Sequence, residues 1–416
     1  MKKLPVLFLL YYLLGNATAW GQKAMLTNVV NQTKPNAAPG FALLTSHFHQ
    51  YVDKGVLAGT VIIVGKGDQL YKDHYGMQNM EAEIPMSFES IFRLASMTKP
   101  IVSVALMTLV EEGKISLDDP IVKFIPGFKN LKVYQSENEL ATPKTALTLR
   151  HLLSHTGGIT SGFDDSPAGQ ICAEMMREKK PGSLEEIINV LAETPLAFHP
   201  GEGWAYSYST DVLAYVIEQV TGERIDQFLT RKVLKPLKMN DTGFQVPPEK
   251  INRFTALYAT GEDGKLTLAD NPKDSPYTNG QQFPRGNGGL TSTPLDYFRF
   301  AQMLLNGGEL DGVRILKKET IEMMATNVVP EEHLPIRIGG KAVPGYGFGL
   351  GFGVLVGDPP FGSAGDFFWP GAAFTYFFIN PKEGTCAVFM TQLSDRTKMN
   401  LIGEFHGLAS GVFQRR

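Results

Sequence analysis

Hydrophobic residues recur along the chain with two different spacings. Apolar positions three and four residues apart, the spacing of an amphipathic helix, indicate helices at 41–51, 100–112, 184–192, 211–220, 225–233, 295–305 and 397–413. Runs rich in β-branched, aromatic or alternating Gly residues indicate strands at 59–64, 69–75, 345–356, 372–379 and 385–390. The strands therefore gather near the two ends of the chain, and most of the helices lie between them.

This arrangement predicts the fold class. The two early strands flank a Gly-containing turn at 65–68 and are expected to form an antiparallel hairpin. Strands near the other end can complete the same sheet. We expect an α/β protein of the α+β type, with one sheet built from both chain ends and a mostly helical region, about 115–285, inserted between them.

The N-terminus has the pattern of a secretory signal peptide. Two lysines precede an apolar run at 4–14 and a small-x-small cleavage pattern at 17–19. We therefore predict a signal peptide at 1–19, a flexible polar leader at 20–39 and a folded domain at 40–416, located in the periplasm or outside the cell. The apolar run is shorter than the roughly 20 residues that span a bilayer, so no stable membrane anchor is expected.

Composition narrows the function classes. The chain has 416 residues, 43% hydrophobic and 19% charged, with a formal net charge of −3, which excludes a disordered, collagenous or coiled-coil protein. No block of basic residues is present, so nucleic acid is not expected as a partner. Cys172 and Cys386 could pair in an oxidising compartment, but cysteines so far apart are more often buried small hydrophobic residues.

The strongest local candidate for chemistry is Ser96-Met97-Thr98-Lys99, which directly precedes Pro100 and a predicted helix. If Ser96 opens that helix, Lys99 lies one turn further along the same face and can reach the hydroxyl. A lysine among apolar side chains has a lowered pKa and can take the serine proton, which activates the nucleophile. A Ser-x-x-Lys tetrad arises by chance about once in a chain of this length, but here it occurs only at this position.

A second candidate is the turn-rich stretch 201–211, directly before another predicted helix. A tyrosine on such a loop can face a cleft, and a phenol beside a cationic lysine has a lowered pKa, so Tyr206 could relay protons. The alternative is that Tyr206 is half-buried packing and that Asp211 is only the N-cap of the helix.

Other motifs are weak or missing. His151 and His155 could share a helix face, but the sequence between them lacks the Glu of H-E-x-x-H, and His47 and His49 form an equally weak pair. With no recognisable third ligand, we expect no metal site. The sequence also lacks the G-x-S-x-G of α/β-hydrolases and a Walker A loop, and no cofactor is expected.

Five blocks in order along the chain carry a family resemblance. They are Phe92-Arg93-Leu94-Ala95-Ser96-Met97-Thr98-Lys99, Leu149-Arg150-His151-Leu152-Leu153-Ser154-His155-Thr156-Gly157-Gly158, Tyr206-Ser207-Tyr208-Ser209-Thr210-Asp211-Val212-Leu213, Gly288-Gly289-Leu290-Thr291-Ser292-Thr293-Pro294 with Asp296-Tyr297, and Phe368-Trp369-Pro370-Gly371-Ala372. From about residue 41 to about residue 413, the chain resembles the serine β-lactamase-like hydrolases. That family includes class C β-lactamases, D-alanyl-D-alanine carboxypeptidases and family VIII carboxylesterases.

The resemblance implies an antiparallel sheet flanked by helices, with the active site where the sheet meets the helical region. It also implies that Ser96 attacks the carbonyl of a small-molecule ester or amide, while Lys99 and Tyr206 share the role of base. By analogy, the oxyanion is held between the backbone N–H of Ser96 and that of Ala372, on the strand that borders the cleft.

Two departures from the family bear on the substrate. β-Lactamases and peptidases begin the third motif with Lys or His followed by Thr-Gly, and that cation recognises a substrate carboxylate, whereas this chain has Trp369-Pro370-Gly371. They also carry Asn two residues after the catalytic Tyr, where this chain has Tyr208. Trp369 and Tyr208 are therefore candidate substrate-binding residues that favour an uncharged acyl group. Trp369 resembles the esterase branch, but Pro370 departs even from that branch and fits only where the strand faces an open cleft.

The sequence therefore predicts an exported serine hydrolase, most similar to a carboxylesterase, that works through an acyl-enzyme on Ser96. One alternative is a class C-like β-lactamase or D-Ala-D-Ala carboxypeptidase. Another, from a different class, is a non-catalytic, penicillin-binding-type protein. The presence of Ser96, Lys99 and Tyr206 together argues against the non-catalytic alternative, because a binding protein gains nothing from keeping all three.

Overall fold

The computed structural model describes residues 39–137, 139–162, 166–394 and 400–413. The predicted signal peptide lies outside these residues, and so does the predicted leader except for its last residue. That residue, Pro39, is the first residue of helix α2 (Pro39–Asp53).

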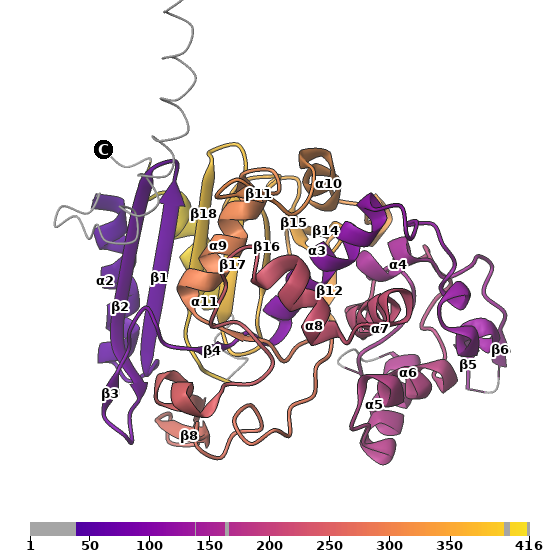
Figure 1. The fold of residues 1–416 in the computed structure, drawn as a ribbon, viewed down its shortest axis with the longest axis horizontal. Helices are drawn as coiled ribbons and strands as arrows, with labels where there is room; N and C mark the ends of the chain where they lie inside the picture. Colours follow the sequence, from indigo (N-terminus) through magenta and orange to yellow (C-terminus); the bar gives the residue numbers. More distant parts are fainter. Residues whose placement is uncertain (1–38, 138, 163–165, 395–399, 414–416) are drawn as a thin grey trace, which may run out of the picture.

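An eight-stranded antiparallel sheet forms the centre of the molecule, with the strand order β14-β15-β16-β17-β18-β1-β2-β3. The strands are β1 (Gly59–Lys66), β2 (Gln69–Asn79), β3 (Ile84–Pro85), β14 (Tyr346–Phe348), β15 (Gly353–Leu355), β16 (Phe367–Pro370), β17 (Thr375–Asn380) and β18 (Thr385–Met390). The early strand β1 pairs with the late strand β18, with Val61 opposite Met390 and Lys66 opposite Thr385. Figure 1 shows these indigo and yellow strands side by side, so the sheet is built from both chain ends, as predicted.

Helices cover both faces of the sheet. On one face, Phe48 of α2 contacts Phe389 of β18, and α2 packs beside α11 (Asn400–Ser410). On the other face, Phe298 of α9 (Pro294–Leu305) fills the space beside Gly65 of β1. Gly65 and Phe389 lie on opposite faces, because Phe389 pairs with Ile62, three residues before Gly65, and side chains alternate along a strand.

The predicted strands differ from the observed ones at one important place. The chain from Gly371 to Phe374 is a turn, in which Phe374 has φ +59°, and β17 begins only at Thr375. The Gly-rich stretch forms β14 and β15. A side chain at Gly349 would lie 2.1 Å from the carbonyl oxygen of Met324, which confirms the expected close backbone packing.

The regular elements between residues 115 and 285 are mainly helices, with two small hairpins that periodicity did not predict. Its helices are α4 (Leu149–Leu153), α5 (Pro167–Lys179), α6 (Leu184–Glu193), α7 (Ser209–Thr221) and α8 (Ile225–Leu229), with 3-10 turns at Ile121–Lys123, Pro126–Asn130 and Pro248–Arg253, a π-helical turn at Thr230–Leu234, and hairpins β5 (Val133–Ser136) with β6 (Glu139–Ala141) and β7 (Leu257–Thr260) with β8 (Leu266–Asp270). In Figure 1, α5, α6 and the β5–β6 hairpin lie at the end of the molecule away from β1 and β2.

Helix α3 (Thr98–Glu111) connects the sheet to this helical region. It is buried on every side from Thr98 to Leu109 rather than on one face only, because α7 and α8 pack against it. It follows β4 (Phe92–Arg93), which pairs with β9 (Thr291–Ser292), and the 3-10 turn Ala95–Met97. A buried helix gives the residues at its start a fixed position.

Several short elements lie between α9 and β14 in the sequence. They are β10 (Glu309–Leu310), β11 (Val313–Arg314), α10 (Lys318–Met324), a 3-10 turn at Glu331–His333, β12 (Arg337–Ile338) and β13 (Lys341–Ala342). Cys172 in α5 and Cys386 in β18 are both buried, as expected for small hydrophobic residues. Within the described part of the chain, no helix has the length and apolar character needed to cross a bilayer.

Candidate active site

The predicted nucleophile and base come together at the start of α3. Ser96 lies in the 3-10 turn that leads into the helix, and Lys99 lies in the first turn of the helix. Lys99 Nζ is 3.2 Å from Ser96 Oγ, within hydrogen-bond distance. Ser96 is partly exposed whereas Lys99 is only 3% exposed. The hydroxyl is therefore accessible while its neighbouring amine is shielded from water.

The backbone before Ser96 is held in an uncommon conformation. Ala95 has φ +46°, in the left-handed region that residues other than Gly rarely adopt. Such a residue costs about 1 to 3 kcal/mol and persists only where the surrounding structure holds it. The turn at Ala95 is thus fixed by its neighbours rather than by its own preference.

Burial is the main reason that the pKa of Lys99 is lowered to about 7; the nearby Asp211 carboxylate partly opposes this effect, and the Arg285 guanidinium adds to it. A lysine with this pKa is partly unprotonated near neutral pH and can accept the proton of Ser96. Lys99 Nζ also donates to the carbonyl oxygen of Asn287 at 2.7 Å, which fixes the direction of the amine.

Asp211 and Arg285 hold this carbonyl in place. Asp211 is completely buried in the first turn of α7 and accepts hydrogen bonds from Arg285 Nη2 at 2.5 Å and from the backbone N–H of Asn287 at 2.7 Å. The alternative role of Asp211 as an N-cap is therefore wrong, since the N-cap position of α7 is Tyr208. Sequence reasoning missed Arg285 and Asn287, although Asn287 directly precedes the block that begins at Gly288.

Tyr206 joins the same cluster from the loop before α7. Its ring lies 4.5 Å from Lys99 Nζ, and Trp369 Nε1 donates to Tyr206 Oη at 3.4 Å. Trp369 is a buried residue of β16. The predicted serine, lysine and tyrosine, together with the third-motif tryptophan, therefore occupy one site where the sheet meets the helical region.

The third motif lies directly against the short stretch of chain that leads to Ser96. A side chain at Gly371 would lie 2.3 Å from the carbonyl oxygen of Leu94, so only Gly fits there. Gly371 N–H donates to the Thr375 carbonyl at 2.7 Å. Gly371 and Thr375 are therefore a hydrogen-bonded pair. In an antiparallel ladder such pairs alternate with non-hydrogen-bonded ones, so Pro370 and Tyr376 form a non-hydrogen-bonded pair, and the backbone nitrogen of Pro370 points away from β17. β15 pairs only with Phe367 and Phe368, so the missing N–H of Pro370 leaves no ladder bond broken.

The proposed second oxyanion donor has a different setting from the one expected. Ala372 lies in the turn after β16, not on the strand itself, and it is exposed. Its neighbour Gly371 nevertheless contacts Leu94, two residues before Ser96. The pairing of the Ala372 and Ser96 N–H groups as oxyanion donors remains a prediction.

Tyr208 lies next to Arg285. The Arg285 guanidinium carbon is 5.6 Å from the centre of the Tyr208 ring, and burial raises the pKa of Tyr208. The role of Tyr208 in substrate binding stays a prediction.

His155 is a neighbour of Tyr206 that sequence reasoning considered only as a metal ligand. Its ring centre is 5.2 Å from that of Tyr206, and its Nδ1 is 2.8 Å from Ser207 Oγ. Burial lowers the pKa of His155 to about 3, so the imidazole is neutral. His151 instead takes part in the capping box of α4. Among the described residues, no three His, Cys, Asp or Glu side chains are grouped so that they could hold a metal ion.

Comparison with known proteins identifies the family. The model of the Beta-lactamase family matches residues 44–405. An uncharacterized protein of Mycobacterium tuberculosis is 32% identical over 82% of this chain and 87% of its own length, and Esterase EstB of Burkholderia gladioli is 34% identical over 56% of this chain and 59% of its own length. Among solved structures, simvastatin synthase (LovD) from Aspergillus terreus has a TM-score of 0.77 at 22% identity and covers 91% of this chain and 100% of its own, which shows the shared fold.

The blocks around Ser96, Tyr206 and Trp369 all fall within the matched residues, and the structure brings them into one site. The chain belongs to the Beta-lactamase family and is a serine hydrolase.

Proposed function

We propose that this chain is an exported carboxylesterase that hydrolyses small or medium uncharged acyl esters through an acyl-enzyme on Ser96. We infer the substrate class from the third motif, Trp369-Pro370-Gly371. Trp369, a neutral and buried side chain, contacts Tyr206 Oη at 3.4 Å, where relatives that recognise a carboxylate have Lys or His. An indole in that position offers one hydrogen-bond donor and a large apolar surface but no charge for a substrate carboxylate.

The nearby charged groups support the same substrate class. The guanidinium of Arg285 is paired with Asp211 through two hydrogen bonds, at 3.2 and 2.5 Å. Its charge is therefore already compensated by a completely buried carboxylate. Aromatic rings surround Tyr206, namely those of His155, Trp204 and Trp369. An acyl group that carries a carboxylate would lose water here without gaining a cation.

The chemical steps follow from these positions. Lys99 in its unprotonated form accepts the proton of Ser96 as Oγ attacks the ester carbonyl, and the tetrahedral oxyanion receives hydrogen bonds from the N–H groups of Ser96 and Ala372. Tyr206 donates a proton to the departing alkoxide and recovers one from Lys99. The alcohol leaves, and Ser96 keeps the acyl group. A water molecule, deprotonated by the same pair, then attacks the acyl-enzyme; the pair returns this proton to Ser96 Oγ as the acid leaves.

Other relatives give the alternative. Penicillin-binding protein 4* of Bacillus subtilis is 28% identical over 79% of this chain and 66% of its own length. A β-lactamase or D-Ala-D-Ala carboxypeptidase activity would need a substrate carboxylate to be recognised without a third-motif cation. We propose esterase activity first because Trp369 occupies that position.

The location is part of the proposal. A signal peptide at 1–19 would direct the chain out of the cytoplasm, and the folded domain from residue 40 would act in the periplasm or outside the cell. Expression of the full chain and N-terminal sequencing of the exported product test this directly. A product that begins near Trp20 supports it, and retention of Met1 in the cytoplasm contradicts it.

Parallel hydrolysis of p-nitrophenyl butyrate and nitrocefin by the mature protein, beside Ser96→Ala, tests the activity. Ester turnover that disappears in the variant, with little nitrocefin hydrolysis, is the expected result. Dominant nitrocefin turnover would make the β-lactamase alternative correct. If neither substrate reacts and a fluorophosphonate probe fails to label Ser96, the chain is a binding protein.

A further inference from the structure

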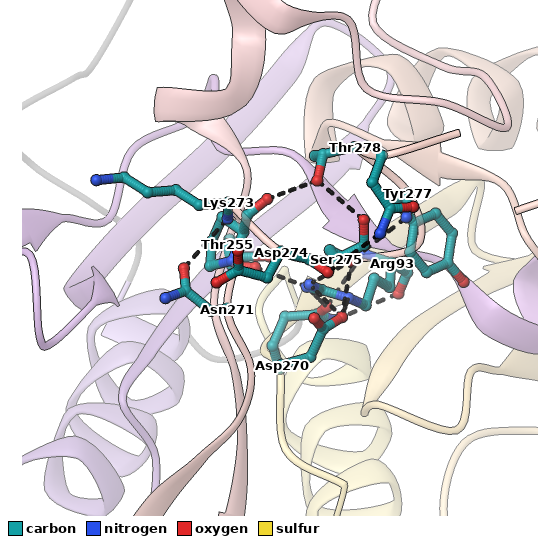
Figure 2. A network of polar contacts seen from close by, with 12 residues as sticks. Arg93, Thr255, Asp270, Asn271, Lys273, Asp274, Ser275, Tyr277 and Thr278 are labelled. Carbon is teal, nitrogen blue, oxygen red and sulfur yellow. Dashed lines mark hydrogen bonds and ion pairs between the residues drawn. The ribbon is translucent and has the colours of Figure 1, made fainter. Parts of the chain in front are cut away.

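A buried arginine lies just before the nucleophile and outside the catalytic cluster. Arg93, three residues before Ser96, has a side chain that is 5% exposed. Its Nε and Nη2 both donate to Asp270 Oδ2, at 3.0 and 2.7 Å, and its Nη1 donates to the carbonyl oxygen of Thr255 at 2.6 Å. Ser275 Oγ donates to the same carboxylate oxygen at 2.8 Å. Figure 2 shows the Arg93 guanidinium between Asp270 and Ser275 in this network.

Aromatic rings shield the guanidinium from water. Its central carbon lies 4.0 Å from the centre of the Phe254 ring and 5.7 Å from that of Tyr277. A planar guanidinium can stack on a ring through its face while its edge donates several hydrogen bonds in fixed directions. A lysine ammonium cannot reproduce that combination, so the site is specific for arginine.

The backbone of Arg93 is held as tightly as its side chain. Gln392 Oε1 accepts a hydrogen bond from Arg93 N–H at 3.1 Å, and Gln392 Nε2 donates to the Arg93 carbonyl at 3.3 Å. At the next residue, Leu94 N–H donates to the Leu290 carbonyl at 2.9 Å, and Thr375 Oγ1 donates to the Leu94 carbonyl at 3.1 Å. These bonds restrain the chain directly before the left-handed residue that precedes Ser96.

The same guanidinium also fixes the segment that reaches Lys99. Asp270 and Ser275 lie at the beginning of the segment 270–287, and Asn287 at its end supplies the carbonyl that accepts from Lys99 Nζ at 2.7 Å. Arg93 therefore connects the stretch of chain that leads to Ser96, on which it lies, with the start of the segment whose other end contacts Lys99.

We propose that Arg93 is a positioning residue that sets Ser96 and Lys99 relative to each other. This inference rests on the proposed Ser96 chemistry, but not on an ester being the substrate. A buried ion pair adds little net stability compared with apolar residues of similar size. Its value here is geometric, because a displacement of about 1 Å at a reacting group can lower the rate about 100-fold.

Two variants of Arg93 distinguish a role in positioning the catalytic groups from a role in folding alone. Arg93→Lys keeps the positive charge but loses the paired hydrogen bonds to Asp270 and the stacking of the planar guanidinium on Phe254. The double variant Arg93→Met with Asp270→Leu removes both charges, so neither is left buried and unpaired, and it is expected to fold. Arg253→Lys is the matched control, because Arg253 also donates to a carboxylate through two nitrogens, Nη1 to Asp241 Oδ1 at 3.1 Å and Nη2 to Asp241 Oδ2 at 2.7 Å.

The measurement is the rate constant with which a fluorophosphonate labels Ser96, beside kcat and KM for p-nitrophenyl butyrate and the urea midpoint of each variant. Both Arg93 variants are expected to label about 100-fold more slowly, with kcat reduced in parallel and KM within about twofold of wild type. Arg253→Lys is expected to label at the wild-type rate.

Two results would overturn the proposal. One is wild-type labelling by the double variant at an unchanged urea midpoint, and the other is an equal loss in Arg253→Lys. A wild-type protein that labels at Ser96 but leaves the ester intact would overturn the proposed substrate alone, since the labelling comparison among variants still tests Arg93.

Discussion

The two ends of strand β16 lie in two different clusters of buried ionisable side chains. At one end Trp369 contacts Tyr206, which lies beside Lys99. At the other end Asp366 directly precedes the strand, and its Oδ2 is 2.8 Å from His406 Nε2 on α11. The other imidazole nitrogen of His406 is 2.7 Å from the hydroxyl of Tyr376. Both clusters combine a tyrosine with a nitrogen base inside an aromatic shell.

The clusters differ in access rather than in composition. Tyr376 and His406 are fully buried and Asp366 is 1% exposed, and the His406 ring stacks on Phe378 with centres 3.9 Å apart. Each polar atom named there faces another protein group, so no substrate atom can enter. In the cluster of Ser96, Lys99 and Tyr206, by contrast, Ser96 stays partly exposed. A buried base becomes a catalyst only where it touches a group that the substrate can reach.

The largest expected effect is on that exposed group. Ser96→Ala removes the nucleophile and should lower kcat for p-nitrophenyl butyrate by at least about 10⁴-fold. Ser103→Ala is the matched control, because Ser103 is a buried serine further along the same helix and outside the cluster. If the control lost as much activity as Ser96→Ala, the loss would reflect damage to α3 rather than loss of the nucleophile.

The second effect comes from the pKa of Lys99. Burial lowers it to about 7, and only the unprotonated amine can take the serine proton. Activity should therefore be full above pH 8 and fall about tenfold per pH unit below pH 7, giving about a 100-fold loss in kcat/KM at pH 5. A pH–rate profile in a constant-ionic-strength buffer checks this. A profile flat from pH 5 to pH 8 would exclude Lys99 as the base.

A substitution in the cluster of Asp366, Tyr376 and His406 should change the stability of the protein but not its reaction rate. His406→Ala leaves the Asp366 carboxylate buried without its imidazole partner and should lower the free energy of unfolding by about 3 to 5 kcal/mol, measured by urea unfolding. The rate at which a fluorophosphonate labels Ser96 in the folded variant should not change. A slower rate would show that the two ends of β16 are coupled and would remove the contrast between the clusters.

Acid should weaken the same cluster. Burial lowers the pKa of His406 below its usual value, although Asp366 partly opposes this. The unfolded chain then binds a proton at this histidine more readily than the folded chain does, so stability is full above about pH 6.5 and falls as the pH drops below it. The urea midpoint of wild type should decline between pH 6.5 and pH 5 more steeply than that of a His406→Leu, Asp366→Leu double variant.

Local patterns were enough to predict the fold class and to single out the Ser96–Lys99 pair as a candidate, which the family resemblance then strengthened. The helices at α2, α3, α6, α7 and α9 follow the apolar spacing, and the Ser96–Lys99 pair depends on one helical turn, a geometry that sequence spacing determines. The π-helical turn after α8 and the turn at Gly371–Phe374 were missed. Their backbone conformations depend on tertiary contacts, such as the one between Gly371 and Leu94.

The rest of the site depends on contacts between distant parts of the chain. Asn287 reaches Lys99 through its backbone carbonyl, and a carbonyl leaves no mark in a sequence, since every residue has one. Asp211 had the appearance of a helix cap because its role depends on Arg285, 74 positions away. Tyr206 could be placed beside Lys99 only through the family resemblance.

The smallest effect is expected at Trp369, the residue of β16 that contacts Tyr206. Trp369→Phe keeps an aromatic ring on β16 but removes the N–H that lies 3.4 Å from Tyr206 Oη. One neutral hydrogen bond contributes about 1 kcal/mol, so kcat should fall about fivefold. If the indole is instead the main determinant of the acyl site, KM for p-nitrophenyl butyrate will rise while kcat stays the same.

Trp204→Phe is the matched control, because the Trp204 indole N–H has no hydrogen-bond partner among the described residues. This variant should leave kcat unchanged. An equal loss in both variants would mean that aromatic packing around Tyr206, rather than the Trp369 donor, sets the rate.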